Sequence, residues 1–373
     1  MVIDKKSVIY TFILLAIFPP HILSHNTAIK ATLNVVQVLA TLFYTAKLVQ
    51  KKKTNRSMIL ILLYLMVIFC STYFENKAIY QACVYILNIL GFVFLLESEV
   101  LCNAEKLLLN MKRYFYFVTV VNYLYLLISV YLLKQSADDS LILGPSNSIT
   151  AMLLFAIFSS ALYDIVYLKQ IEKSTFILII VIVHTELLVW SGTGMIGCFI
   201  MLIYLVFGCV KSKSIFRKKR LSYAGLNFVA IGLFVTVTIF RTIEWFSFVI
   251  EDILQKDVTL TGRTVIWDFY IERILEAPII GHGIAYSPYK GLFAHSGYLD
   301  IAVKSGFCGV ILFILLVIVT GKKLKSCNSN LTYNLIAVSL FSFEIMMLTE
   351  MPNIILLLGI LLMGIHYPMI NNG

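Results

Sequence analysis

Hydrophobic positions in this chain follow one another in long runs, and short polar loops separate the runs. About 20 residues of helix cross the hydrocarbon core of a bilayer, so each run predicts a transmembrane helix. The twelve runs lie near 7–23, 27–49, 57–74, 78–96, 114–133, 148–168, 175–190, 194–210, 222–240, 298–320, 331–349 and 353–370. We therefore expect an all-α integral membrane protein with about 12 transmembrane helices.

Charged residues between the runs predict the orientation of the helices. Lys and Arg residues gather in the loops at 5–6, 51–56, 106–113, 169–173, 211–220 and 322–325. If the N-terminus is cytoplasmic, all six loops are cytoplasmic, as the positive-inside rule requires. We expect both termini in the cytoplasm, nine helices in residues 1–240, a large external loop at 241–297 and three helices in 298–373.

Composition narrows the class of protein further. The chain is 60% hydrophobic and 13% charged, which is typical of a protein that has lipid as its solvent. Its net charge of +10 comes from the basic loops, so we expect no nucleic-acid partner. The seven cysteines form no CxxC or Cys/His cluster, and we expect neither a disulfide framework nor a zinc site. The first run has no cleavage site after it and predicts an uncleaved span.

The external loop holds the longest polar-containing interval of the chain, and 262–277 within it predicts a short helix. At 100° per residue, Arg263, Trp267 and Tyr270 share a face with Ile274, and Asp268, Glu272 and Glu276 share the opposite face. A guanidinium on the aromatic face favours an anion, and a phosphate can bind it in bidentate fashion. Snorkelling to lipid headgroups, or a pair with a nearby carboxylate, explains Arg263 equally well.

Two histidines follow this helix. His282 lies in a Gly-His-Gly sequence that predicts a flexible turn, and on its own it is more often a loop residue than a catalyst. His295 precedes the tenth run, where the positive end of a helix dipole disfavours protonation and so favours a neutral general base. An ordinary interfacial histidine is the alternative. Asp300 and Lys304 are spaced i,i+4, so we expect an ion pair between them.

Four short motifs occur in order in this region. They are GR-x3-W (Gly262, Arg263, Trp267), AP-x2-GHG (277–283), AHSGYL (294–299) and KSGF-x-G (304–309). Over residues 261–314 this order resembles the signature region of the bacterial O-antigen polymerase/ligase family. In that family a histidine follows a Gly-x-Gly turn and opens a span.

The resemblance implies a GT-C-type glycosyltransferase of the bacterial cytoplasmic membrane that uses an undecaprenyl-diphosphate-linked glycan as donor and needs no metal or cofactor. It implies that His295 is the catalytic base and that Arg263 binds the diphosphate. Relatives usually carry a second arginine in an S-R-type motif that opens an earlier span. This chain has Gly194 there, so we expect Arg241, or otherwise Lys304, to replace that arginine.

Other residues are weaker candidates. Trp267, Tyr270, Tyr286, Tyr289 and Tyr298 are candidates for stacking on sugar rings or for anchoring at the membrane interface, and anchoring is the safer interpretation. His184 and Glu186 lie within the seventh run, where ionisable residues by default suggest function, although hydrogen bonding between helices is the alternative. Glu344 and Glu350 are similarly ambiguous.

The expected function is a polymerase that joins lipid-linked repeat units into O-antigen, capsule or exopolysaccharide. A ligase that moves finished glycan to lipid A core or another acceptor shares the same motifs. A lipid-linked oligosaccharide flippase is a rival from another class, but transporters place their polar groups near mid-bilayer. A membrane scaffold without catalysis is a further alternative. A flippase and a chain-length regulator are the protein partners that the resemblance suggests.

Overall fold

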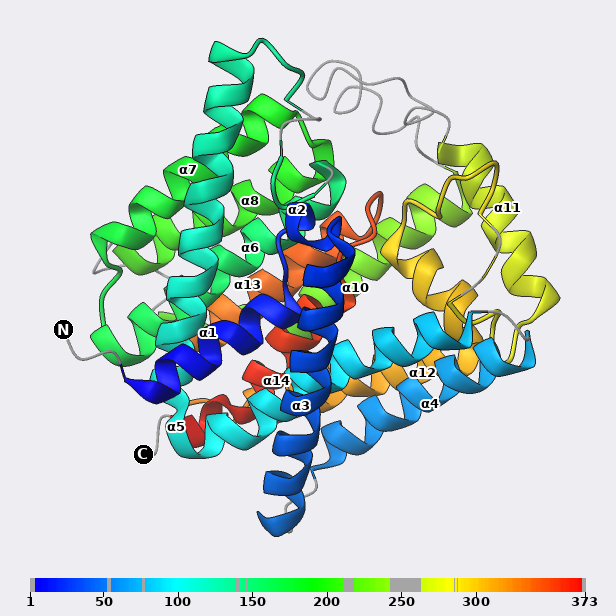
Figure 1. Cartoon of the computed structure of the whole chain (residues 1–373), viewed down its shortest axis with the longest axis horizontal. Coiled ribbons are helices and arrows are strands. Elements are labelled where there is room, and N and C mark those ends of the chain that lie inside the picture. Colours follow the sequence, from blue (N-terminus) through cyan, green and yellow to red (C-terminus); the bar gives the residue numbers. More distant parts are fainter. Residues whose placement is uncertain are drawn as a thin grey trace.

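The computed structural model describes residues 4–51, 55–75, 78–137, 141–144, 146–210, 218–241, 263–284, 286 and 288–370. Every regular element in these ranges is helical (Figure 1). The helices are α1 (Lys5–Ile17), α2 (His21–Ser24), α3 (Thr27–Lys51), α4 (Arg56–Phe74), α5 (Ile79–Leu127) with η1 (Ile128–Leu132), α6 (Ser146–Tyr163) with η2 (Asp164–Leu168), α7 (Lys173–Val189), α8 (Gly192–Tyr204) with η3 (Leu205–Val210), α10 (Tyr223–Phe234) with η4 (Val235–Ile239), α11 (Arg263–Glu276), α12 (Gly297–Leu324), α13 (Asn330–Met346) and α14 (Ile354–Ile370).

Every one of the twelve predicted runs is largely helical, but the match is not one to one. The run 7–23 is divided between α1 and α2 at Pro19 and Pro20, and the runs 78–96 and 114–133 both belong to α5. Among the described residues, six stretches are long and apolar enough to cross a membrane by length and composition. They are Thr27–Gln50, Arg56–Phe74, Ile79–Val100, Cys102–Leu132, Ile149–Leu168 and Gly297–Leu324. The all-helical class is therefore confirmed for the described chain. The count of twelve spans and the external position of residues 241–297 stay predictions.

The third basic loop, at 106–113, is not a loop in the structure. α5 continues from one run into the next, and only Asn103 departs from helical geometry (φ −144°, ψ 39°). The polar residues of this interval are paired with other helices, which lets the backbone remain helical. Tyr10 donates a 2.5 Å hydrogen bond to Glu99, and Lys112 pairs with Asp164 at 2.5 Å. The expectation of a separate loop was therefore wrong.

Helices α6, α13 and α14 form the centre of the bundle. α13 packs against α6, α8, α10 and α14, and nearly all of its residues are buried. The 18-residue window that marks α6 as a candidate span is 94% buried, against 28% for α3, so α3 belongs to the periphery. Figure 1 shows α13 and α14 behind α1 and α3, with α4 and α12 running together toward α11.

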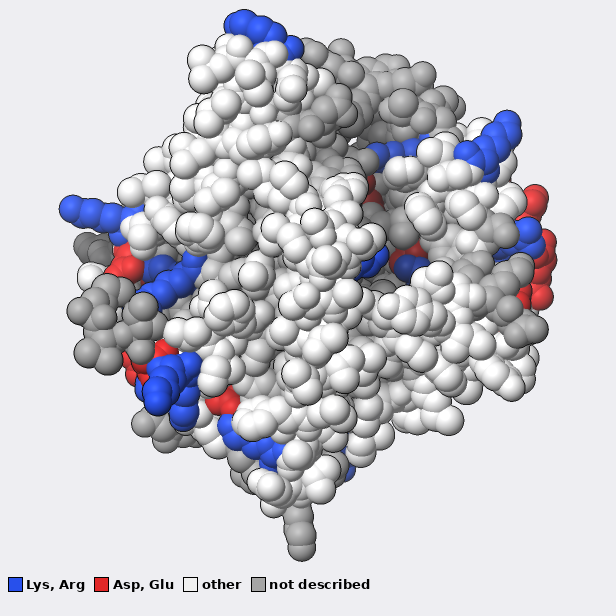
Figure 2. All heavy atoms as spheres, viewed as in Figure 1, with Lys and Arg blue, Asp and Glu red and all other residues white. Residues whose placement is uncertain are grey.

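The outer surface of the bundle is largely uncharged. Figure 2 shows one face on which Lys, Arg, Asp and Glu lie mainly along the margins, around a broad area of uncharged side chains. Leu39, Leu42 and Phe43 of α3 and Phe228 of α10 are among the large hydrophobic side chains that are more than half exposed. Such a surface is suited to contact with lipid chains rather than water.

Candidate functional site

Helix α11 carries Arg263 at its first position. It spans Arg263–Glu276, close to the predicted 262–277, and it buries Ile266, Trp267, Tyr270 and Ile274 against α12. Asp268, Glu272 and Glu276 lie on the exposed side. The two faces predicted from the helical period are therefore confirmed. Trp267 and Tyr270 are fully buried, so both rings contribute to the packing between α11 and α12.

Arg263 binds the segment that follows α13. Its guanidinium donates hydrogen bonds to the carbonyl oxygen of Thr349 and, at 3.0 Å, to Oε1 of Glu350. The side chain of Arg263 is 14% exposed and that of Glu350 is 4% exposed, so this ion pair is largely removed from solvent. The sequence left a phosphate, a lipid headgroup or a nearby carboxylate as partners for Arg263. In the structure its partner is the Glu350 carboxylate. A buried guanidinium held in this way presents a fixed positive charge.

The backbone around His295 is held against the end of α13. Ser296 is the N-cap of α12, and its Oγ donates to the carbonyl oxygen of Met347 at 3.2 Å. The Gly297 amide donates to the same oxygen at 2.9 Å. Ala294 on the other side is fully buried in the cluster formed by α11 and α12. His295 itself adopts the left-handed region, with φ 46°.

His295 is partly buried beside Arg263. Burial lowers the pKa of its imidazole, and the positive charge of Arg263 lowers that pKa further. The direction agrees with the expectation of a neutral ring, but the cause differs. α12 begins at Gly297, two residues later, and the shift comes from burial and Arg263. No hydrogen bond or ion pair joins His295 to another residue in the described part of the chain.

Helices α7 and α8 complete the surroundings of the Arg263–Glu350 pair. Thr193 and Thr349 share a hydrogen bond of 2.7 Å between their hydroxyls, which joins the start of α8 to the segment after α13. Glu186 of α7 is 2% exposed and lies close enough to Glu350 for their charges to interact. Arg263, His295, Glu186 and Glu350 therefore gather in one region, although they come from four separate segments.

Gly194 lies in the same region, where relatives usually have an arginine. A Cβ atom at this position would lie 2.6 Å from Cγ2 of Thr150 and 2.7 Å from Oγ of Ser191. Both distances are shorter than side chains tolerate, so neither neighbour leaves room for a longer residue unless it moves. The packing around Gly194 therefore does not accommodate an arginine unless Thr150 and Ser191 move.

The two predicted replacements have partners of their own. Arg241 pairs with Asp268, and its Nη2 donates to the Thr264 carbonyl at 3.5 Å. Lys304 pairs with Asp300 at 2.6 Å, as the i,i+4 spacing predicted. Arg241 therefore contacts the same turn of α11 that carries Arg263, whereas Lys304 is held within α12. This difference favours Arg241 as the second cation.

The ring of His282 is held between Glu75 and the backbone of α11. Its Nδ1 lies 2.8 Å from Glu75, and its Nε2 lies 2.9 Å from the carbonyl oxygen of Arg273. Both ring nitrogens of His282 therefore have partners within the protein. The Gly-His-Gly turn is also held by its backbone, since the amides of His282 and Gly283 donate to the carbonyls of Val303 and Lys304 at 2.8 and 3.0 Å. The expected flexible turn is instead fixed to α12.

The remaining candidates have contacts of their own. His184 shares a 2.7 Å hydrogen bond with Tyr123, between α7 and α5. Tyr286 donates to Asp300 at 2.8 Å, Tyr289 packs against Phe269, and the ring of Tyr298 lies 4.6 Å from that of Phe234. None of these contacts includes His295, Arg263 or Glu350.

Sequence reasoning missed Thr193 and Thr349 and did not pair Arg263 with Glu350. The two charged residues are 87 positions apart, and no helical period relates residues on different helices. The available signal was the position of Glu350 at the end of an apolar run, where an acid by default suggests function. Among the described residues, no group of three or more His, Cys, Asp or Glu is arranged to hold a metal ion.

Comparison with known proteins identifies the family of this region. Residues 174–314 match the family described as O-Antigen ligase. The matched segment includes Glu186, Arg263 and His295, and it contains the whole of the signature region. No curated protein matches the chain. The similarity to the O-antigen ligase family therefore covers residues 174–314.

Proposed function

We propose that this protein is a glycosyltransferase that polymerises oligosaccharide repeat units carried on undecaprenyl diphosphate. The reaction takes place at the outer face of the cytoplasmic membrane. The growing glycan is the donor, and a hydroxyl of the incoming lipid-linked repeat unit is the acceptor. The product is an O-antigen, a capsule or an exopolysaccharide.

One observation carries the proposal. A partly buried histidine lies beside a fixed guanidinium, within the segment that matches the O-antigen ligase family. A neutral imidazole accepts a proton, and a guanidinium binds a phosphate through two parallel hydrogen bonds. Transfer of a glycan from a diphosphate carrier needs both groups at the reacting bond.

In this mechanism His295 removes the proton from the acceptor hydroxyl as its oxygen attacks the anomeric carbon of the donor sugar. The new C–O bond forms while the bond to the diphosphate breaks, and the diphosphate leaves with the electron pair. The configuration at the anomeric carbon inverts. Arg263, together with Arg241, stabilises the negative charge on the departing diphosphate, which removes the need for a metal ion.

Glu350 and the diphosphate compete for Arg263 in the proposed cycle. The Glu350 carboxylate already accepts a hydrogen bond from the Arg263 guanidinium, so a bound diphosphate has to compete for that donor. Glu350 holds Arg263 in a fixed orientation between turnovers.

A ligase is the second candidate, because the matched family is described by that activity. It uses the same donor and the same leaving group. Its acceptor is lipid A core or another finished acceptor in place of a lipid-linked repeat unit.

The test is the size distribution of surface polysaccharide and of its lipid-linked precursors. We would compare wild type, a deletion strain, His295→Ala and His25→Ala, a matched control that removes an exposed histidine far along the sequence. For a polymerase, the deletion strain and His295→Ala make single repeat units only, while His25→Ala resembles wild type. Full-length glycan that stays on its carrier identifies a ligase. Normal polymer from His295→Ala at normal protein levels would overturn the catalytic assignment.

A further inference from the structure

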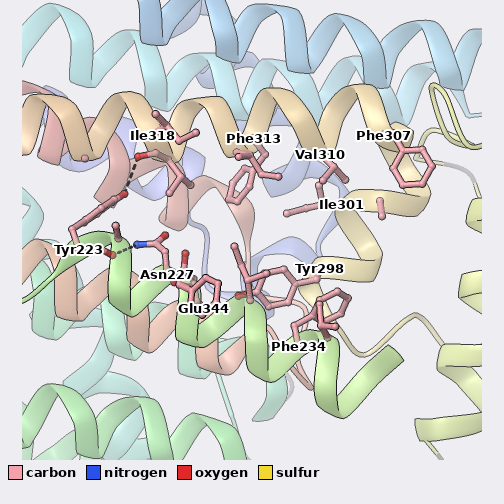
Figure 3. A pocket seen from close by; sticks show the side chains of 18 of the residues that line it. Tyr223, Asn227, Phe234, Tyr298, Ile301, Phe307, Val310, Phe313, Ile318 and Glu344 are labelled. Carbon is pink, nitrogen blue, oxygen red and sulfur yellow. Dashed lines mark hydrogen bonds between the residues drawn. The ribbon is translucent and has the colours of Figure 1, made fainter. Parts of the chain in front are cut away.

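A cavity of about 900 Å³ lies between α10 and α12 (Figure 3). α10 with η4 forms one wall, α12 forms the other, and α11 and α13 contribute residues to it. Its lining is almost entirely hydrocarbon; Figure 3 shows Ile301, Val310 and Phe313 of α12 facing Phe234 across the cavity. A cavity of this character is suited to an apolar chain.

The charged residues of the lining are separated along its length. Lys322 and Lys325 lie at one end of α12, where both side chains are exposed. No ion pair joins either lysine to an acid in the part of the chain that the structure describes. Among the described lining residues, the one acid is Glu344 of α13, which lies between Asn227 and Tyr298 in Figure 3. A negatively charged headgroup is therefore favoured at the lysine end.

The neighbouring loop adds a further cation to this end. Arg220 precedes α10, and its Nη1 donates to the carbonyl oxygen of Lys325 at 2.8 Å. Its guanidinium also stacks over the ring of Tyr333, a lining residue, at 5.0 Å. Three cations thus surround the mouth, and Arg220 is fixed there by its contacts.

The apolar lining continues along α12 from the lysines. Phe307 and Lys325, the C-cap of α12, both line the cavity and are about 27 Å apart at 1.5 Å per residue. The hydrocarbon core of a bilayer is about 30 Å thick and holds two leaflets, so one leaflet accounts for about 15 Å of it. A lipid with its phosphate at the lysines therefore places its acyl chain along the nearer part of this lining, which includes Ile314, Val317 and Ile318.

We propose that the groove between α10 and α12 binds an anionic phospholipid, whose phosphate contacts Lys322 and Lys325 and whose acyl chain lies along the apolar walls. Basic pockets between transmembrane helices bind anionic headgroups in this way. By the positive-inside rule the lipid belongs to the cytoplasmic leaflet. The site is independent of the proposed transfer reaction.

The test is lipid retention by the purified full-length protein. Delipidated protein in detergent is titrated with phosphatidylglycerol or phosphatidylcholine, and bound lipid is measured by native mass spectrometry. Wild type is expected to bind phosphatidylglycerol more tightly. Each lysine near a membrane surface contributes about 1 kcal/mol to the binding of anionic lipid, so Lys322→Gln/Lys325→Gln is expected to weaken binding about thirtyfold, or about 2 kcal/mol.

Two further variants separate the groove from general surface charge. Ile314→Trp fills the apolar wall and is expected to weaken binding of phosphatidylglycerol at least tenfold while both lysines remain. Lys323→Gln removes an exposed lysine of the same turn that does not line the cavity, and it is expected to bind as wild type does. Equal loss in Lys323→Gln, or unchanged binding in Ile314→Trp, would overturn the proposal. Retention of polyprenyl diphosphate in place of phosphatidylglycerol would overturn it too.

Discussion

At the scale of single residues, the position of His295 is determined by its neighbours in the chain. Ala294 is buried in the α11–α12 cluster, and Ser296 and Gly297 both bind the carbonyl of Met347. These contacts hold His295 at φ 46°, a region that costs a non-glycine residue about 1–3 kcal/mol. The surrounding packing compensates for that strain and keeps the ring beside Arg263.

The pKa of His295 predicts the acid limit of the transfer reaction. Burial and Arg263 lower this pKa below the usual value of about 6.5. The imidazole therefore stays neutral, and able to accept a proton, at pH 6.5, and it becomes protonated only as the pH falls further. We expect kcat/KM, measured in proteoliposomes with lipid-linked repeat units, to be constant near pH 6.5 and to fall below it. An acid limb centred above pH 6.5 would contradict the assignment of His295 as the base.

The Arg263–Glu350 pair allows structural and functional roles to be separated. Arg263→Met removes the cation that faces the buried Glu350 carboxylate, and breaking such a pair costs about 3 kcal/mol or more. In Arg263→Met/Glu350→Gln the carboxylate is absent as well, so most of the stability is expected to return. Transfer activity is expected to stay lost in both variants, because the guanidinium is missing. Thermal unfolding in detergent and glycan polymerisation measure the two effects.

If the double variant regains activity together with stability, Arg263 serves only the fold, and the diphosphate must bind elsewhere. Arg241→Gln is the companion variant, because it removes the other cation at the same turn of α11 and leaves Arg263 in place. It is expected to raise the KM for donor without unfolding the protein, since its pair with Asp268 is exposed and contributes little stability.

At the scale of elements, backbone hydrogen bonds join the segment after α11 to an interruption in α12. α12 is interrupted at Gly306, where φ is 57° and ψ is −165°. The amides of Phe307 and Cys308 donate to Pro278 and Ile279 rather than to their own helix. The carbonyls of Val303 and Lys304, left without those donors, accept from the Gly-His-Gly turn. These two amides and two carbonyls of α12 are all hydrogen-bonded to the segment after α11, so the turn and the helix hold each other in place.

The glycines at this junction predict a graded loss of stability. A Cβ atom on Gly306 would lie 2.5 Å from the carbonyl carbon of Ile279, and one on Gly281 would lie 2.6 Å from the Gly306 amide. Gly291 also has a positive φ, of 84°, but nothing lies within 4 Å of its Cβ position. Gly291→Ala is therefore expected to cost about 1 kcal/mol, whereas Gly281→Ala and Gly306→Ala add a backbone clash to that cost.

Unfolding temperatures of the three variants, measured in one detergent, check this order. Equal losses would mean that only the backbone conformation matters and that the junction tolerates displacement. The Gly-His-Gly sequence predicted a turn. The approach of Gly306 to this turn could not be foreseen, because the interruption of α12 depends on partners outside the helix.

At the scale of the whole molecule, local sequence predicts the helices well and their arrangement poorly. Runs of apolar residues identify helices because length and hydropathy are local properties. The central position of α13 and the peripheral position of α3 are not local properties, since both are apolar along their length. The same limit applies to the site. The faces of α11 follow from the helical period, but the meeting of Arg263 with Glu350 depends on how α11 and α13 pack.

The orientation of the molecule in the membrane is the last prediction. The basic loops place Lys323 in the cytoplasm and α11 outside. Glu272 and Lys323 are both exposed, so Glu272→Cys and Lys323→Cys in a cysteine-free background provide matched probes. A membrane-impermeant maleimide added to intact spheroplasts is expected to label the cysteine at 272 and to label that at 323 only after lysis. Labelling of both positions, or of 323 alone, would contradict an external α11 and, with it, a reaction at the outer face of the membrane.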